Sequence, residues 1–400
     1  MKILQLCNKP PIPAVDGGCI AMNTITQGLL KAGHEVKILT IETQKHPALY
    51  QEMPEAYKTK TRIESVFIDT SVNLVDAFSA LVTSDSYNVS RFFSPDYDRR
   101  LVQILSEEQF DIIHLESLFM TPYIATIRRH SKAPIVLRSH NLEYIIWERM
   151  AEVSRNQAKK AYLKLLARQL KKYEMQVINT VDGIAAISGE DAKKYHQQKC
   201  KKPIINLAFG INLSGYKPVE LQREQTTVFH IGSMDWTPNI EGIDWFLKMV
   251  WPIVQKKNPQ LKLHLAGRKM PSHLNQYSDQ NVVIDGEVSD AKEFINQHCV
   301  MVVPLLTAGG MRVKIIEAMA MKKAIVSTRI GAEGIDYEKG KHLLIADEPE
   351  QFADAILSVT SQPECCKELG TSARRLVEEH YDNEVLTEKL IGFYHTLLKK

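Results

Sequence analysis

The chain of 400 residues has few cysteines, little net charge and no long hydrophobic run, and each shortage excludes a class of protein. The six cysteines form no C-x-x-C pair and no Cys/His metal spacing, so they indicate neither a zinc module nor a disulfide framework. The net charge of +3 argues against nucleic acid as a partner, because nucleic-acid-binding domains are usually strongly basic. No run reaches the roughly 20 apolar residues of a membrane span. Since the start also lacks a signal-peptide pattern, we expect a cytoplasmic protein.

Two regions repeat one pattern of short apolar runs and amphipathic stretches. The pattern covers residues 1–210 and again residues 227–382, and it predicts two α/β domains with parallel sheets. The polar stretch 211–226 is the expected linker. Open parallel sheets bind ligands at the carboxyl ends of their strands. We therefore expect the two domains to face each other across a cleft that holds a ligand.

The expected elements of the first domain begin with a strand over residues 2–7, a loop, and a helix that stops at Gly33. Residues 144–181 predict a long helical stretch, followed by a buried strand at 183–188. In the second domain, residues 240–255 predict a helix after the first strand.

A glycine pair, Gly17-Gly18, lies between the first strand and the first helix. Glycines let a backbone approach a phosphate closely, and a helix N-terminus adds N–H donors and a positive dipole. The alternative is an ordinary strand-to-helix turn. Because the pair is not part of G-x-G-x-x-G, the dinucleotide fingerprint is missing and a dehydrogenase is the least expected enzyme.

The most informative segment runs from residue 308 to residue 317 and follows an apolar strand. Gly309, Gly310 and Met311 open a helix that carries Arg312 and Lys314, a layout that suits a diphosphate. Glu317 lies among apolar helix residues, where a carboxylate needs a partner, and a pair of ribose hydroxyls would serve. The alternative is a surface ion pair between these cations and Glu317, which would contribute little.

The segment 309–320, followed by 324–328, resembles the signature of family 4 glycosyltransferases. Weaker likenesses lie at 17–18, 32–36 and 231–239, so the resemblance covers nearly the whole chain. It implies a retaining, nucleotide-sugar-dependent enzyme with the α/β GT-B fold: two facing Rossmann-like domains with an inter-domain cleft. It also implies that the C-terminal helix, residues 383–400, packs back on the first domain.

The resemblance assigns Glu317 to the nucleotide ribose. The family often has an E-x7-E pair, and its first Glu falls on Gly309 here, which leaves the donor sugar open. Many members also carry Arg and Lys in the loop that corresponds to 232–239, and this chain has none there. Arg312 and Lys314 are the expected replacement cations.

Four further residues follow predicted strands and complete the expected donor site. His140 ends a strand of the first domain, and by resemblance it contacts the donor sugar; the alternative is a structural histidine. Ser233 stands in the first loop of the second domain, and by resemblance the loops with Arg268 and Val288 surround the nucleobase. The alternative for the last two is an ordinary surface loop.

Two other features concern the acceptor site and contact with a membrane. His114 is expected to be structural, and Glu116 to edge the acceptor site. The stretch 155–172 carries a basic stripe at helical spacing, with leucines on another face, which suits an anionic membrane surface or a lipid-phosphate acceptor. A plain solvated helix face is the alternative. The stripe consists of Lys160, Lys164, Arg168 and Lys171.

The predicted reaction is a retaining sugar transfer from a UDP- or GDP-sugar to a hydroxyl acceptor, with no cofactor. No carboxylate pair suited to double displacement is apparent, so we expect attack on the face that the diphosphate leaves. No metal is expected, because Asp-x-Asp is absent and the two cations replace it. The resemblance implies a glycan or lipid-linked acceptor at the inner face of the membrane. A nucleotide-sugar epimerase and a non-catalytic sugar-nucleotide-binding protein remain as alternatives.

Overall fold

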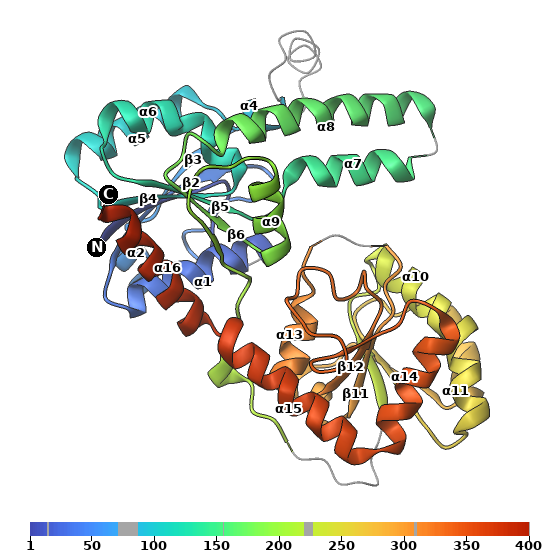
Figure 1. The fold of residues 1–400 in the computed structure, drawn as a ribbon. Helices are drawn as coiled ribbons and strands as arrows, with labels where there is room; N and C mark the ends of the chain where they lie inside the picture. Colours follow the sequence, from blue (N-terminus) through green and yellow to red (C-terminus); the bar gives the residue numbers. More distant parts are fainter. Residues whose placement is uncertain (14–15, 71–86, 155, 220–226, 308–309, 400) are drawn as a thin grey trace. The chain divides into compact units, whose positions relative to one another are not determined.

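The computed structural model describes residues 1–13, 16–70, 87–154, 156–219, 227–307 and 310–399. The chain divides into two compact units, one of Met1–Ala208 with Leu386–Lys400 and one of Phe209–Val385 (Figure 1). Each unit is built on one parallel sheet, so the expectation of two Rossmann-like domains is confirmed. The described part of the predicted linker, 211–219, belongs to the second unit, and 220–226 lies outside the described residues.

The first unit contains a seven-stranded parallel sheet in the order β3-β2-β1-β4-β5-β6-β7. Most of its strands are short apolar runs buried on both faces, as expected where helices cover both sides of a sheet. The strands are β1 (Lys2–Cys7), β2 (Glu35–Glu42), β3 (Glu64–Phe67), β4 (Ile112–Glu116), β5 (Ile135–Ser139), β6 (Gly183–Ala186) and β7 (Ile204–Asn206).

The helices of this unit are α1 (Gly17–Lys31), α2 (Glu55–Thr61), α4 (Tyr87–Ser90), α5 (Pro95–Glu107), η1 (Leu118–Tyr123), α6 (Ile124–His130), α7 (Glu143–Val153), α8 (Gln157–Val177), α9 (Gly189–Gln197) and most of α16 (Asn383–Leu398). The helical stretch predicted over 144–181 is divided into two helices, α7 and α8, which pack along each other (Figure 1). Ser154 takes an extended conformation that ends α7. The Asn156 side chain then caps α8 by accepting from the Lys159 N–H at 3.0 Å.

The second unit contains a six-stranded parallel sheet in the order β10-β9-β8-β11-β12-β13. Its strands are β8 (Val228–Ile231), β9 (Leu263–Ala266), β10 (Val282–Gly286), β11 (Val300–Val303), β12 (Ala324–Ser327) and β13 (Leu344–Ile345). Its helices are η2 (Leu213–Gly215), α10 (Thr237–Trp245), η4 (Phe246–Val250), α11 (Trp251–Lys257), η5 (Ser272–Gln280), α12 (Ala291–Asn296), α13 (Val313–Ala320), α14 (Pro349–Ser361) and α15 (Pro363–His380).

The helix predicted over 240–255 corresponds to α10 and α11, joined by the π-helical turn η4. Pro252 near the start of α11 explains the irregularity, because proline cannot donate a helical hydrogen bond. Phe246 of this turn and Trp251, the first residue of α11, are fully buried in the core of the unit.

Candidate functional site

The predicted donor residues of the second unit gather at the carboxyl ends of four adjacent strands. Ser233 follows β8, Arg268 follows β9, Val288 follows β10, and Arg312 and Lys314 follow β11. The strand order reverses between β8 and β11, since the chain runs outward through β9 and β10 and returns on the other side of β8. Such a switch point opens a crevice that binds ligands in parallel α/β sheets.

Lys314 lies at this switch point, in the first turn of α13. Its Nζ donates to the carbonyl of Ile231 and to Oδ1 of Asn239, both at 3.1 Å, and lies 3.4 Å from Nε2 of His230. Burial, followed by the charge of Arg312, lowers the pKa of Lys314 to about 7. The ammonium is thus held beside the Ser233 loop in surroundings that favour its neutral form, and an anion there would favour the charged form.

Arg312 is the N-cap residue of α13, directly before the first helical residue, Val313. The residue is 7% exposed. The guanidinium carbon lies 5.4 Å from the ring centroid of Trp236, a cation–π arrangement. Gly310 has a left-handed φ of 84°, which only glycine adopts readily. Met311 follows it and is half-buried, whereas Gly309 lies outside the described residues.

Glu317 is already held by a partner that the sequence did not indicate. The hydroxyl of Tyr216 donates to Oε1 of Glu317 at 2.7 Å. Burial raises the pKa of Glu317, and the Tyr216 hydrogen bond opposes that shift. Tyr216 is itself fixed, because Arg374 donates to its carbonyl at 2.9 Å and Lys292 Nζ lies 4.2 Å from its ring centroid.

The loops after β8, β9 and β10 are packed closely together. Gly267 has a φ of 152°, and a Cβ on it would lie 1.8 Å from the carbonyl oxygen of Gly232, so no other residue fits there. The Met234 N–H donates to the carbonyl of Arg268 at 2.9 Å. Ser233 donates to Asp235 at 2.6 Å, while the side chain of Arg268 is exposed and Val288 is half-buried. The three loops thus form one continuous edge of the sheet.

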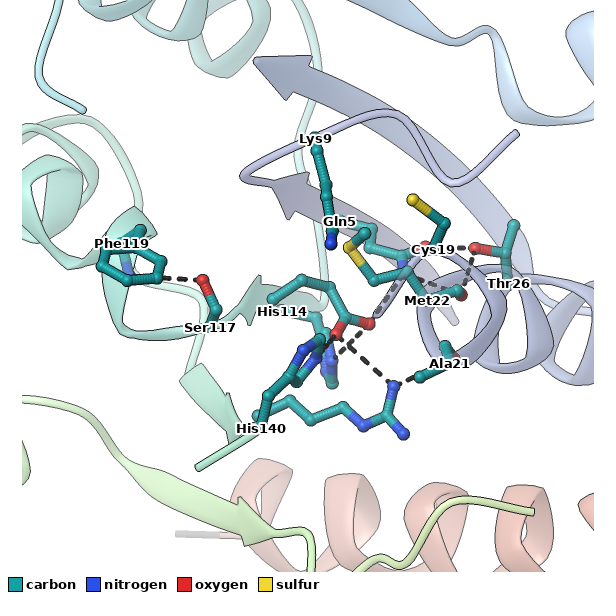
Figure 2. A network of polar contacts seen from close by, with 12 residues as sticks. Gln5, Lys9, Cys19, Ala21, Met22, Thr26, His114, Ser117, Phe119 and His140 are labelled. Atoms are coloured by element: carbon teal, nitrogen blue, oxygen red, sulfur yellow. Dashed lines mark hydrogen bonds and ion pairs between the residues drawn. The ribbon is translucent and has the colours of Figure 1, made fainter. Parts of the chain in front are cut away.

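In the first unit, His140 comes directly after β5 and beside the carboxyl end of β4. Its Nε2 lies 2.8 Å from Oε2 of Glu116, the last residue of β4. Glu116 is fully buried, whereas the His140 side chain is 14% exposed. Figure 2 shows His140 and His114 converging on this carboxyl group. The prediction that Glu116 edges the acceptor site is therefore wrong, because the residue has no exposed surface.

Other buried polar groups surround the Glu116 carboxylate (Figure 2). Gln5 donates to its Oε1 at 2.9 Å, and Arg138 Nη1 lies 3.5 Å from its Oε2. His114 Nε2 lies 3.3 Å from Oε1, and Nδ1 of the same ring is 2.6 Å from the hydroxyl of Tyr394 in α16. His114 is fully buried, which agrees with its expected structural role.

Three neighbouring side chains decide the ionisation of Glu116. Burial alone would raise the pKa of Glu116, but Arg138, His114 and His140 together hold it well below its usual range. Burial lowers the pKa of His140, and Glu116 opposes that shift. An ionised Glu116 paired with Arg138 beside a neutral His140 ring is consistent with both directions.

Gly17 and Gly18 are the first two residues of α1. Asp16 caps this helix by accepting from the Cys19 N–H at 3.0 Å, and it also pairs with Lys9 at 2.6 Å. As predicted, the two glycines open the helix that follows β1. The helix lies beside the point between β1 and β4 where the strand order reverses, and Lys9 is held close to its N-terminus by Asp16.

Three positioning residues were not singled out from the sequence: Asn239, Tyr216 and Gln5. Asn239 donates to the carbonyl of Ser233 at 2.8 Å while it accepts from Lys314, so it joins the loop to the cation. A polar residue inside an apolar strand was the available signal for Gln5. Tyr216 offered no such signal, because its partner lies 101 residues away in the chain.

The basic stretch forms the first part of α8. Leu163, Leu166 and Leu170 are buried, as the pattern indicated, while Lys164 and Arg168 are exposed. Lys171 lies 4.8 Å from the ring centroid of Tyr144. None of the helices in the described part of the chain has the length and apolar character needed to cross a membrane.

Two family models match successive parts of the chain. Residues 16–213 match a model described as Glycosyltransferase Family 4, and residues 225–362 match one described as Glycosyl transferases group 1. An uncharacterized 44.6 kDa protein in the cps region of Klebsiella pneumoniae is 23% identical over 402 residues, which cover 96% of this chain and 97% of the relative. The capsular polysaccharide biosynthesis glycosyltransferase CapM of Staphylococcus aureus is 30% identical over 130 residues, or 30% of this chain and 32% of CapM.

Two solved structures show the same fold along the whole chain. Sucrose-phosphate synthase from Thermosynechococcus elongatus has a TM-score of 0.68 at 15% identity, with 100% of both chains covered. Anabaena HepE in complex with UDP has a TM-score of 0.64 at 13% identity, with 99% of this chain and 100% of HepE covered.

Proposed function

The chain belongs to the family 4-like glycosyltransferases of the GT-B fold, and from that premise we propose that it transfers a sugar from a UDP- or GDP-sugar to a hydroxyl acceptor with retention of configuration. One observation carries the proposal. Lys314 is held at the β8–β11 switch point beside Arg312, with the Glu317 carboxylate one helical turn further along α13. Two cations suit a diphosphate and the carboxylate suits ribose hydroxyls. The UDP complex of HepE, a protein of the same fold, supports this assignment.

In the proposed reaction, the bond from the anomeric carbon to the diphosphate breaks while the acceptor oxygen attacks from the same face. Arg312, Lys314 and the N–H groups around Met311 stabilise the charge that develops on the leaving diphosphate. Its phosphate oxygen takes the proton of the acceptor hydroxyl. His140 accepts a hydrogen bond from a hydroxyl of the donor sugar and so orients it.

Same-face attack is preferred to double displacement because the carboxylate nearest to His140 cannot be a nucleophile. Glu116 is fully buried and already engaged by Gln5 and Arg138. We also propose that the reaction needs no metal, since Arg312 and Lys314 provide the positive charge that the diphosphate requires.

The acceptor is proposed to be a glycan or lipid-linked oligosaccharide at the inner face of the membrane. The likeness to CapM, a capsular polysaccharide biosynthesis enzyme, supports the acceptor class. The outward face of α8 supports the location: Lys164, Arg168 and Lys172 are exposed beside Leu165 and Tyr162, which are 42% and 43% exposed. Basic and apolar groups on one helix suit an anionic lipid surface.

The proposal is tested first with a panel of UDP- and GDP-sugars, scored by thermal stabilisation and then by transfer to lipid-linked oligosaccharides. We expect one nucleotide class to stabilise the protein, and the product to keep the anomeric configuration of the donor by NMR. Lys314→Ala should lower turnover at least about 100-fold, because it removes a positive charge that stabilises the leaving diphosphate. Lys248→Ala, at an exposed position of the same unit, is the matched control.

Three outcomes would contradict parts of the proposal. Inversion of configuration would exclude the retaining reaction. Conversion of the donor into an isomer without acceptor would favour an epimerase. Activity that disappears in excess EDTA and returns with Mg²⁺ or Mn²⁺ would refute metal independence.

A further inference from the structure

Glu116 has no exposed surface and yet it makes a close polar contact with His140. The His140 Nε2 to Glu116 Oε2 distance is 2.8 Å, and the histidine, unlike the glutamate, reaches the surface. A group with this placement cannot touch a substrate, but it can determine the state of the one that does. From this geometry we propose that Glu116 is the positioning residue of His140, fixing it as the neutral tautomer with the proton on Nε2 and the lone pair on Nδ1. The inference rests on the proposed contact of His140 with the donor sugar.

The tautomer follows from which atoms can donate. An ionised carboxylate only accepts hydrogen bonds, so the nitrogen that faces it must carry a proton. That nitrogen is Nε2. Nδ1 is then the acceptor that the proposed reaction requires for a sugar hydroxyl. If the proton moved to Nδ1, the ring would become a donor on its substrate side.

The surroundings of the ring as a whole favour its neutral form, against the pull of Glu116. Glu116 and Arg138 already balance each other inside the protein. Burial of the ring is the largest influence against an imidazolium, and the charges of Arg138 and Lys9 act in the same direction. A second buried cation would have no counter-charge, and such a charge is costly.

The carboxylate itself is fixed from several directions, so it can fix the ring. The side-chain amide of Gln5 donates to Oε1 of Glu116, and the amide oxygen of Gln5 accepts from the Thr26 hydroxyl at 2.7 Å (Figure 2). Ser117, the next residue after Glu116, has a left-handed φ of 85°, and its hydroxyl accepts from the Phe119 N–H. The chain therefore turns away directly after Glu116, which leaves His140 at the surface and its partner beneath it.

The test measures the His140 ring directly in the full-length protein without substrate. Long-range ¹H–¹⁵N spectra, with the His140 signals identified by their loss in His140→Gln, should show a protonated Nε2 and an unprotonated Nδ1 at neutral pH. In Glu116→Gln the proton should spread over both nitrogens, and the ring should titrate at lower pH because the negative charge is gone. The turnover number should fall about 100-fold, with unchanged affinity for UDP or GDP, whichever binds.

Two companion variants keep the test decisive. Tyr97→Phe removes a buried hydroxyl of the same unit that donates to the carbonyl of Leu39 at 2.9 Å, outside the Glu116 network, so ring and turnover should stay as in the wild type. If Glu116→Gln does not fold because Arg138 is left unpaired, the double variant Glu116→Gln/Arg138→Met removes both buried charges and takes its place.

A wild-type ring with its proton on Nδ1, or an imidazolium at neutral pH, would overturn the inference. So would a glutamine variant with unchanged ring signals. These signals do not depend on any reaction, so failure to transfer sugar would count against the proposed function alone.

Discussion

The surroundings of Lys314 disfavour the charged form of its side chain. Burial and Arg312 lower its pKa to about 7 in the unliganded protein, and the carbonyl of Ile231 and Oδ1 of Asn239 hold its Nζ in place. A bound diphosphate adds negative charge and must raise that pKa again. Binding of the donor is therefore linked to protonation of this one side chain.

The sign of this linkage gives a prediction. At pH 6 Lys314 is already charged, and nucleotide-sugar binding should take up almost no proton. At pH 8 most of the free protein is neutral at this position, so binding should take up close to one proton and become weaker as the pH rises. Calorimetry of UDP-glucose or GDP-mannose, whichever binds, in Hepes and in Tris measures the uptake.

Lys314→Met supplies the control for this titration, since it should abolish the uptake at pH 8. A sugar nucleotide is used because its diphosphate, unlike that of free UDP, has no secondary phosphate ionisation near pH 6. Equal binding enthalpies in the two buffers for the wild-type protein would show that Lys314 does not change its charge.

Tyr216 supports a second residue-scale prediction. Its hydroxyl holds Glu317 and opposes the burial that raises the pKa of this carboxyl. Tyr216→Phe should weaken binding of a ribonucleotide by about tenfold, the worth of one hydrogen bond to a charged group. The affinity for the matching 2′,3′-dideoxynucleotide should not change, because that ligand lacks the hydroxyls that Glu317 would bind.

If Tyr216→Phe lowers the affinity for both ligands, Tyr216 acts on the fold of the site and not on the ribose contact. Tyr277→Phe, in η5 of the same unit, is the matched removal of a hydroxyl and should leave both affinities unchanged.

These residues also show how far a sequence can predict a site. The strand ends placed Ser233, Arg268, Val288 and Lys314 on one sheet edge, since a parallel sheet brings successive strand ends together. The partners that fix the side chains were not predictable, because they depend on contacts between distant segments. Tyr216 meets Glu317 across 101 residues, and Gln5 meets Glu116 across 111. Whether Glu116 was exposed or buried was likewise set by packing, and sequence reasoning placed it wrongly.

At the scale of elements, the break between α7 and α8 matters most. A helical pattern over 144–181 looked continuous because both helices bury apolar side chains at helical spacing. The extended backbone at Ser154 and the cap at Asn156 convert it into two helices packed along each other (Figure 1). Leu163, Leu166 and Leu170 of α8 thereby face protein, while Lys164, Arg168 and Lys172 are exposed.

This arrangement predicts electrostatic binding to lipid. Lys164→Glu combined with Arg168→Glu should weaken binding to vesicles of phosphatidylcholine with anionic phosphatidylglycerol by at least about tenfold, since each basic residue near such a surface contributes about 1 kcal/mol. Co-sedimentation at low and physiological salt measures the effect. The reversal pair Lys248→Glu and Lys256→Glu, at exposed positions of the second unit, makes the same change in net charge. If both double variants lose vesicle binding equally, the loss reflects net charge alone and a docking face on α8 is refuted.

At the scale of the whole molecule, the first unit is completed by the end of the chain. Residues Leu386–Lys400 belong to it although 177 residues of the second unit, Phe209–Val385, precede them. Leu390, Phe393 and Tyr394 of α16 are buried in the same core as β1 and α1. The Tyr394 hydroxyl also reaches His114 in the network around Glu116. The first domain therefore cannot complete its core before the last helix has been made.

Two glycines allow this closure to be tested with small changes. A Cβ at Gly183 in β6 would lie 2.6 Å from the ring of Phe393 and 3.0 Å from Leu397, whereas a Cβ at Gly392 on α16 would meet nothing within 4 Å. Gly183→Ala should destabilise the protein by about 1–3 kcal/mol, the usual cost of overpacking, and lower the melting temperature. Gly392→Ala should stabilise it by roughly 0.5–1 kcal/mol, because alanine is the better helix former. Thermal and urea unfolding of both variants measure these changes. If Gly183→Ala is as stable as the wild type, α16 does not pack against β6 in solution.

A double variant of Gly183→Ala with Phe393→Leu removes the ring atoms that would clash with the new Cβ. It should regain part of the lost stability only if α16 and β6 touch. That recovery distinguishes a contact with α16 from local strain within β6, and it is the last step of the test.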